Sequence, residues 1–222
     1  MKILLLSDLH GNYKNLYKII KDNMPIDYIF IAGDITNFGP AEEILDLYEE
    51  LKYFNNIKNI YAVFGNCDYI TKNKKIIAQT SIIYVGDKIA TIDKNKIAIA
   101  GIDGGLKSIF GTISEFSEKD FNEKVNNITN NKNWNNTPYK IVITHTPPYK
   151  HLDKVFVKHI GSKSIAKLIG KVNLIVCGHV HEQQGKDEAK GTIIINPGPF
   201  KNGHYAILEL DNNFNLKNLI FR

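Results

Sequence analysis

Short apolar runs that are rich in β-branched residues recur along the chain, and they constrain the fold more than any other feature. Six of these runs end in a small or polar residue, and they occupy residues 2–8, 28–34, 59–66, 140–145, 173–179 and 192–198. A strand that is buried on both faces has such a run, because neither face has to be polar. Helical patterns at 13–22 and 41–53 separate the first three runs. This alternation of strand and helix is typical of an α/β domain.

The middle and the end of the chain predict antiparallel pairing. Residues 81–86 and 89–102 indicate strands with a polar turn at Asp93 to Asn95, and residues 204–210 turn at Asp211 to Asn213 into a final strand at 214–221. An asparagine-rich stretch at 126–138 should finish a helix that begins near Ser114. Mixed pairing of this kind fits two packed sheets better than one open parallel sheet. We therefore predict an α/β fold, a two-sheet mixed β-sandwich flanked by helices, in one domain spanning residues 1–222.

The charge of the chain argues against a nucleic-acid partner. The formal net charge is +5, but the single arginine is Arg222, whereas phosphate and base recognition favours arginine. The apolar stretch near the N-terminus is too short for a signal peptide, and no run has the eighteen apolar residues of a membrane span. The two cysteines, Cys67 and Cys177, make no disulfide framework. We expect a cytoplasmic protein without a membrane partner, either monomeric or homodimeric.

Polar side chains stand at the end of almost every predicted core strand. They are Asp8, His10, Asp34, Asn66, Asp68, His145, His179 and His181. Ligands of α/β sheets bind beyond the carboxyl ends of the strands, so these side chains should meet in one place. In an extended chain, the side chains of residues i and i+2 point the same way. The pair Asp8 and His10 can therefore bind one ligand together, and so can the pair His179 and His181.

The chemistry of these side chains predicts a metal site. Imidazole nitrogens, carboxylates and an amide oxygen suit borderline to hard divalent ions. Without Asp68, seven such ligands remain; they are too many for one tetrahedral ion, and they suit two ions that share a bridging ligand. We expect two divalent transition metals, with manganese favoured and iron, nickel, cobalt or zinc as alternatives.

Five blocks of the chain carry a resemblance to a known family. They are SDLHGN (7–12), AGDI (32–35), GNCD (65–68), THTPP (144–148) and CGHVHE (177–182). In this order they resemble the motifs of the calcineurin-like metallophosphoesterases, D-x-H, G-D, G-N-H-D/E, H and G-H-x-H. The wider chain is similar to the small prokaryotic phosphoesterases related to the Icc cyclic-nucleotide phosphodiesterase.

This resemblance implies a fold of four layers, αββα, and a role for each ligand. Asp8, His10 and His181 would hold one metal, Asn66, His145 and His179 the other, and Asp34 would bridge them. The implied activity is hydrolysis of a small phosphate ester, with a phosphodiester favoured, by in-line attack of a metal-bridging hydroxide. Asn66, His145 and His159 are expected to contact the substrate. Asn196, in the NPGP turn, is expected to act either as scaffold or as a substrate contact.

Cys67 departs from the family pattern, because many relatives carry a histidine there that protonates the leaving oxygen and is oriented by the next acidic residue, here Asp68. Three interpretations of Cys67 stay open. The thiol could act as a weak acid, or serve as a soft metal ligand, or pack without a chemical role beside Asp68, which is the interpretation we favour. A substitute acid could come from the loop after His145, where His151, Asp153 and His159 lie, and His159 is our preferred candidate.

Other functions fit the same motifs. A non-catalytic metal-binding scaffold of the same fold is one alternative, although its hallmark would be the loss of metal ligands, and none is lost here. A phosphomonoesterase or a nuclease would be a substrate variant of the same chemistry. The scattered lysines argue against the nuclease.

Overall fold

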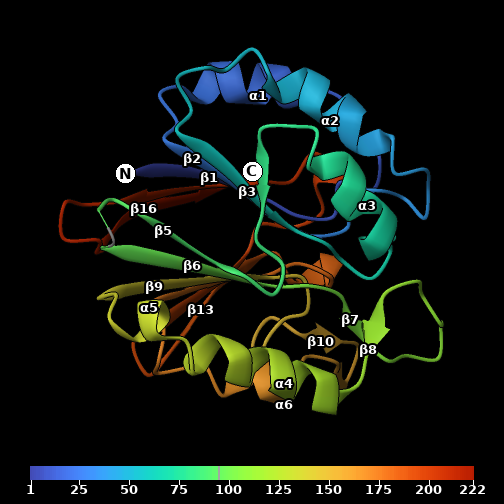
Figure 1. The fold of residues 1–222 in the computed structure, drawn as a ribbon, viewed down its shortest axis with the longest axis vertical. Helices are drawn as coiled ribbons and strands as arrows, with labels where there is room; N and C mark the ends of the chain where they lie inside the picture. The colour runs from blue at the N-terminus through green and yellow to red at the C-terminus, as the bar shows by residue number, and fades with distance from the viewer. Residues whose placement is uncertain (95) are drawn as a thin grey trace.

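The computed structural model describes residues 1–94 and 96–222, which form two large mixed sheets packed face to face between helices (Figure 1). The first six-stranded sheet has the order β16-β15-β1-β2-β3-β4. Its strands are β1 (Lys2–Leu6), β2 (Tyr28–Ala32), β3 (Asn59–Val63), β4 (Ile82–Tyr84), β15 (Ala206–Leu210) and β16 (Leu216–Phe221). β1 to β4 pair in parallel, and β15 and β16 extend the sheet by antiparallel pairing.

The second sheet, also six-stranded, has the order β13-β14-β12-β9-β6-β5. Its strands are β5 (Ile89–Ile92), β6 (Ile97–Ile102), β9 (Tyr139–Thr144), β12 (Leu174–Val176), β13 (Gly185–Ala189) and β14 (Thr192–Asn196). The four central strands are parallel, and β5 and β13 are antiparallel edge strands. Two short ladders lie outside the sheets, β7 (Gly105–Leu106) with β8 (Glu115–Phe116) and β10 (Lys154–Val155) with β11 (Lys158–His159).

The helices form the outer layers. α1 (Leu16–Asn23), α2 (Glu43–Leu51) and α3 (Ile70–Ile77) lie on the first sheet, and α4 (Glu118–Thr129), α5 (Lys132–Asn135) and α6 (Lys163–Ala166) lie on the second (Figure 1). Two short 3-10 helices, η1 (His181–Gln183) and η2 (Phe200–Asn202), follow β12 and β14. No helix in the described part of the chain is long and apolar enough to cross a membrane.

Three apolar cores separate the four layers, which explains why the strand sequences are apolar throughout. In β1, Leu4 and Leu6 pack with the helices of the first layer, whereas Ile3 and Leu5 pack between the sheets. In β12, Ile175 faces the helices of the last layer. Since both faces of each central strand are covered, a polar residue on either face would have to be buried.

The predicted fold class is confirmed, and the structure refines the elements. β5 and β6 form the expected hairpin, but the 81–86 strand does not join it: β4 pairs in parallel with β3 in the other sheet. The predicted turn at Asp93 to Asn95 includes Asn95, which lies outside the described residues. The helix expected from Ser114 begins instead at Glu118, because the Ser117 side chain caps it in a capping box with Asp120.

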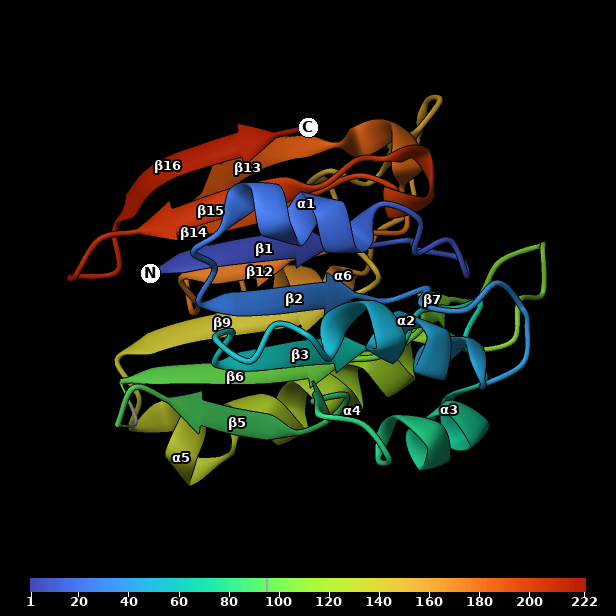
Figure 2. The same ribbon diagram turned by 90° about the horizontal axis from the view of Figure 1, so that it is seen from above.

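The parallel strands of both sheets end at the same edge of the molecule. Figure 2 shows β1, β2 and β3 side by side and running the same way, so that their carboxyl ends lie at one edge of the sheet. A backbone bridge between Ser7 and Pro199 connects the end of β1 to the segment after β14. This edge therefore gathers residues from the whole length of the chain.

Candidate metal centre

The turns that carry the candidate ligands have an unusual backbone. Asp8, His10, Asp34 and His179 have φ angles of 53°, 48°, 47° and 70°. Positive φ is uncommon for residues with a side chain, and strained conformations of this kind cluster at functional sites. The turns therefore aim the side chains inward at some cost in backbone energy.

Two glycines allow the turns to approach one another closely. A Cβ atom on Gly65 would lie 2.0 Å from Oδ1 of Asp34, and one on Gly33 would lie 2.7 Å from Nδ1 of His145. Neither contact is tolerable for a real side chain, so only glycine fits at these positions. The close approach brings the ends of β2, β3 and β9 together around Asp34.

The first group of candidate ligands consists of Asp8, His10 and His181. The Ser7 hydroxyl donates to Oδ2 of Asp8 at 2.5 Å, and the His179 backbone N–H donates to the same oxygen at 3.1 Å. This leaves Oδ1 of Asp8 to face Nε2 of His181 at 3.2 Å and Nε2 of His10 at 4.0 Å. One ligand atom from each of the three residues lies within 4.8 Å of the other two, which is compatible with a shared cation.

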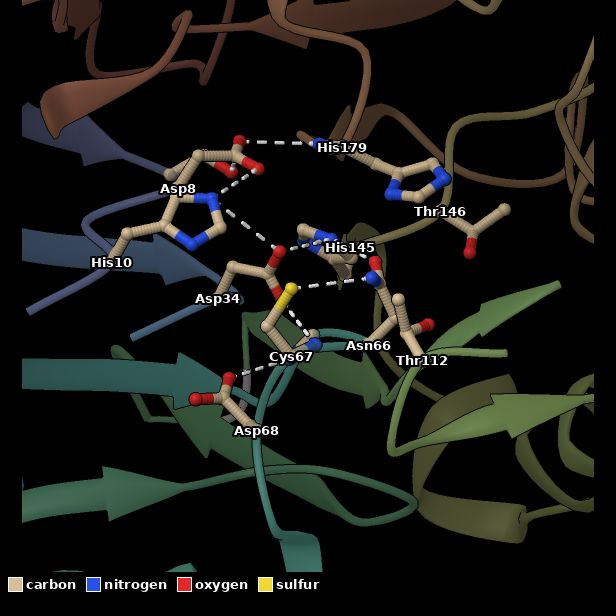
Figure 3. A network of polar contacts seen from close by, with 12 residues as sticks. Asp8, His10, Asp34, Asn66, Cys67, Asp68, Thr112, His145, Thr146 and His179 are labelled. Atoms are coloured by element: carbon tan, nitrogen blue, oxygen red, sulfur yellow. Dashed lines mark hydrogen bonds and ion pairs between the residues drawn. The ribbon is translucent and has the colours of Figure 1, made fainter. Parts of the chain in front are cut away.

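Asp34 lies between the two groups (Figure 3). Its Oδ1 accepts a hydrogen bond from the Cys67 backbone N–H at 2.8 Å. Its Oδ2 lies 3.6 Å from Nε2 of His10 and 3.4 Å from Nε2 of His145. One carboxylate oxygen thus faces a candidate ligand of the first group and a candidate ligand of the second.

The second group is built around His145, which is fully buried. Its Nδ1 donates to the Ala32 carbonyl oxygen at 2.9 Å, while Nε2 lies 2.9 Å from Oδ1 of Asn66. A backbone partner of this kind fixes the ring of a metal-binding histidine and leaves the other nitrogen for the metal. The His179 ring stands next to His145, with 5.0 Å between the ring centroids.

The titration of these groups reflects their burial and their charges. Burial lowers the pKa of His145, but the carboxylate of Asp34 outweighs it and holds that pKa above its ordinary value. Burial and the neighbouring His145 lower the pKa of His179 to about 4, so its ring is neutral at pH 7. A neutral imidazole has the lone pair that a metal needs.

His10 supplies the test of whether a cation fits. Its side chain is only 9% exposed, and neither ring nitrogen has a hydrogen-bond partner among the described residues. A buried polar group without a partner is costly and rare. A cation between His10, Asp8 and Asp34 would give Nε2 of His10 a partner and would neutralise the two carboxylates. The residues therefore fit divalent metals.

Cys67 and Asp68 point in different directions. The Cys67 thiol accepts a hydrogen bond from Nδ2 of Asn66 at 3.4 Å and lies within 4.8 Å of the ligand atoms of His10 and Asp34 (Figure 3). Burial, reinforced by the charge of Asp34, raises the pKa of this thiol. The Asp68 carboxylate instead accepts hydrogen bonds from the backbone N–H groups of the neighbouring turns. Cys67 therefore faces the candidate ligands, and Asp68 braces the turns that carry them.

His159 lies outside this cluster, in the hairpin β10–β11. Its Nδ1 pairs with Oδ1 of Asp153 at 2.6 Å, and its side chain is 34% exposed while that of Asp153 is buried. His151, on the same segment, pairs with Asp187 at 2.8 Å. The structure thus gives His159 an orienting carboxylate but no contact with the seven candidate ligands.

Lys201 is a candidate functional residue that the sequence patterns did not single out. Its backbone N–H donates to the Asp8 carbonyl oxygen at 3.2 Å, and its carbonyl oxygen accepts from Nδ2 of Asn12 at 3.0 Å. The lysine charge is near enough to His10 to contribute to its lowered pKa, behind the larger effect of burial. The sequence pointed to Lys201 only indirectly, because Lys201 follows the NPGP turn. In this turn, Asn196 donates to the Val180 carbonyl oxygen and accepts from the Gly198 N–H.

Comparison with known proteins gives the class of this site. The family model described as calcineurin-like phosphoesterase matches residues 1–183. An uncharacterised protein of Methanocaldococcus jannaschii, MJ1162, is 32% identical over 212 residues, which cover 90% of this chain and 88% of the relative. The chain belongs to the calcineurin-like phosphoesterase family, whose activity is metal-dependent hydrolysis of phosphoesters.

Two further matches support the family and the fold. The uncharacterised metallophosphoesterase YkoQ of Bacillus subtilis is 27% identical over 164 residues, which cover 66% of this chain and 53% of YkoQ. The crystal structure of TT1561 of Thermus thermophilus matches with a TM-score of 0.78 at 17% identity, over 100% of this chain and 97% of that one. The latter similarity concerns the fold alone.

Proposed function

We propose that the chain is a phosphodiesterase that uses two divalent metals, held by Asp8, His10 and His181 on one side and by Asn66, His145 and His179 on the other, with Asp34 between them. Manganese is the favoured metal, and iron, nickel, cobalt and zinc are the alternatives. A small phosphodiester is the favoured substrate. The coarser activity, metal-dependent phosphoester hydrolysis, follows from the family.

The position of Asp34 carries this proposal. Its Oδ2 lies between the Nε2 atoms of His10 and His145, at 3.6 Å and 3.4 Å, so one oxygen is within reach of both ligand groups. A carboxylate that bound a single ion would be expected near the ligands of that ion alone. Asp34 instead lies between two histidines that follow strands of different sheets. The orphaned nitrogens of His10 on one side, and the approach of His145 Nε2 to Oδ1 of Asn66 on the other, support one ion in each group.

The charges of the protein groups fit an anionic substrate. Only two carboxylates, Asp8 and Asp34, are among the seven proposed ligands, so two dications leave the centre with a net positive charge. When bound, such a pair of cations lowers the pKa of a shared water toward neutrality and neutralises charge on the phosphate. The protein groups hold this geometry: Ser7 and the His179 N–H orient Asp8, and the Ala32 carbonyl oxygen orients His145.

Protonation of the leaving oxygen is the step for which the chain has no family histidine. The raised pKa of the Cys67 thiol makes it a poor proton donor. We assign this step to His159, supported by its pairing with the buried Asp153, which holds the ring in one orientation. If His159→Ala leaves kcat and its pH profile unchanged for a substrate with a poor leaving group, this assignment is wrong.

Metal reconstitution tests the proposed function. The metal-free protein would be titrated with manganese, cobalt, nickel, zinc or iron, with the bound metal counted by elemental analysis. The loaded protein would then be assayed with aryl monoesters, aryl diesters and cyclic nucleotides. We expect two metals per chain and hydrolysis that is faster for diesters than for monoesters.

Asp34→Asn is the matched variant, because it preserves the shape of the side chain but removes the charge. We expect it to bind fewer metals and to lose activity by about a hundredfold to a thousandfold, the usual effect of removing a group that stabilises charge in the transition state. Two bound metals without turnover on any ester would favour the scaffold alternative. Faster turnover of monoesters would reject the diester preference alone.

A further inference from the structure

Two loop tips expose large apolar side chains far more than the rest of the described surface. Ile109 and Phe110 are 96% and 83% exposed, and Phe156 and Val157 are 93% and 84% exposed. The next most exposed large apolar side chain in the described part of the chain, Tyr53, is 65% exposed. We call these four residues the paired loop tips. Their exposure is costly in water, so it calls for a partner.

The first tip is held in a defined conformation. The loop between β7 and β8 wraps around the Glu115 carboxylate, which accepts hydrogen bonds from the backbone N–H and the hydroxyl of both Ser108 and Thr112, at 2.7 to 2.9 Å. These contacts hold the pKa of Glu115 down at about 2, against the opposing effect of its partial burial. Ile109 and Phe110 are thus presented by an ordered loop.

The second tip is held in the same way. Phe156 and Val157 form the turn of the β10–β11 hairpin, and Phe156 adopts a φ of 50°. Below the hairpin, the buried Asp153 carboxylate accepts from the backbone N–H groups of Lys150 at 2.9 Å and Gly161 at 3.0 Å. Asp153 therefore holds the base of the hairpin, while the side chains of the turn remain exposed to solvent.

The two loops are also fixed relative to one another. They leave the carboxyl ends of the neighbouring parallel strands β6 and β9, on the side of the candidate metal centre. The Thr146 hydroxyl donates to the Gly104 carbonyl oxygen at 2.8 Å, which joins the bases of the loops. Glu118, just after β8, accepts from the Ser164 hydroxyl at 2.7 Å, beyond the hairpin.

Exposed lysines lie on the segments of both tips, and most of them are at the second tip. Lys107 precedes the first tip, Lys154 and Lys158 flank the second, and Lys150 and Lys163 lie at the base of the hairpin; all five are exposed. The carboxylates of these segments are engaged: Glu115 inside its loop, Asp153 with His159, and Glu118 with the start of α6. At the first tip the ionised Glu115 offsets Lys107, whereas four lysines against the single carboxylate of Asp153 leave the segments around the second tip positive.

We infer that the paired loop tips dock the protein on an anionic lipid surface. Apolar side chains at the tips would enter the boundary between headgroups and acyl chains, and the lysines would contact the anionic headgroups. This mode needs no membrane-spanning segment, which explains why hydropathy along the sequence does not reveal it. The inference holds whether or not the proposed phosphodiesterase activity is correct.

A second copy of the chain fits this surface less well. Two small tips cannot supply the roughly 800 Å² per partner of a standard protein interface. The lysines around them would also repel the same lysines on another copy, in a protein whose net charge is already +5.

Vesicle sedimentation with the full chain tests the inference. Vesicles of phosphatidylcholine alone would be compared with vesicles that also contain phosphatidylglycerol, at low and at high salt. We expect binding only to the phosphatidylglycerol vesicles, and weaker binding at high salt. The double variant Phe110→Ser with Phe156→Ser should reduce the partition coefficient by at least about tenfold, because two large apolar side chains no longer leave water.

Tyr53→Ser is the matched control, because Tyr53 is also an exposed aromatic residue beside a lysine, but it follows α2 in the outer helical layer. It should bind vesicles as the unaltered protein does. The inference is overturned if the unaltered protein binds neither vesicle, or if the double variant binds as well as the control. It is also overturned if sedimentation velocity shows a dimer that only the double variant dissociates, since the tips would then join two copies.

Discussion

The carboxylate of Asp68 accepts hydrogen bonds from both the backbone N–H and the hydroxyl of Thr36, each at 2.8 Å. This relationship joins the turn after β3 to the turn after β2, and these turns carry Asn66 and Asp34. Gly65 N–H donates to the same carboxylate at 2.8 Å. Asp68 therefore links the turn that carries a candidate ligand of the second group to the turn that carries the candidate bridge.

Asp68→Asn should loosen both turns. The amide would direct an NH2 group at backbone N–H donors, so we expect a loss of about 2–4 kcal/mol in the free energy of unfolding, together with weaker metal binding. Urea unfolding of the metal-free protein and metal titration by calorimetry measure the two effects. Asp87→Asn, which alters an exposed carboxylate paired with Lys124, is the control. Unchanged stability in Asp68→Asn would show that Asp68 does not brace the turns.

Metal binding should become tighter as the pH rises. The pKa of His145 is held above its ordinary value by Asp34 when no metal is bound, so the ring keeps a proton at neutral pH. A metal at Nε2 must displace this proton, and its apparent affinity therefore increases toward the raised pKa. Calorimetry in two buffers of different ionisation enthalpy counts the protons released. Binding without proton release at pH 7 would contradict a role for His145 as a ligand.

Cys67→His should restore a proton donor at the place where many family members have one. General acid catalysis contributes about 10²–10⁴-fold, and a poor leaving group needs it most, so the rate on alkyl esters should rise more than the rate on activated aryl esters. The slope of log rate against leaving-group pKa measures this selectivity. Cys67→Ser is the control, because it changes the thiol without adding an imidazole. Equal rate changes along the series would reject the prediction.

Lys201→Met should weaken the binding of anionic substrates. The Lys201 charge acts on His10 of the first group, and a charge-assisted hydrogen bond is worth about 1.5–3 kcal/mol, so we expect KM to rise about tenfold or more with metal content unchanged. Lys201→Arg should restore most of the affinity. Lys186→Met, on the edge strand β13, is the control, since Lys186 pairs with Glu188. An unchanged KM in Lys201→Met would show that the side chain does not contact the substrate.

The sequence alone determined most of the strands and the places of the candidate ligands along them. Apolar runs such as 28–34 and 173–179 predict strands from the local sequence alone, because a strand that is covered on both faces has apolar residues at nearly every position. The same local reasoning placed Asp34 and His179 at strand ends, from which convergence of the ligands could be expected. The four-layer fold followed once the family blocks were matched, and the structure confirms it.

Only the tertiary structure decided features that depend on which segments meet. β4 joins the first sheet and not the hairpin next to it, because pairing with β3 is a long-range contact that residue periodicity does not encode. The same reason explains why Asp68 faces the Thr36 turn, why Lys201 comes to lie beside Asp8, and why Phe110 and Phe156 remain exposed on neighbouring loops. The local sequence sets whether a residue is apolar, polar or charged, but the packing of the two sheets decides which distant residues it contacts.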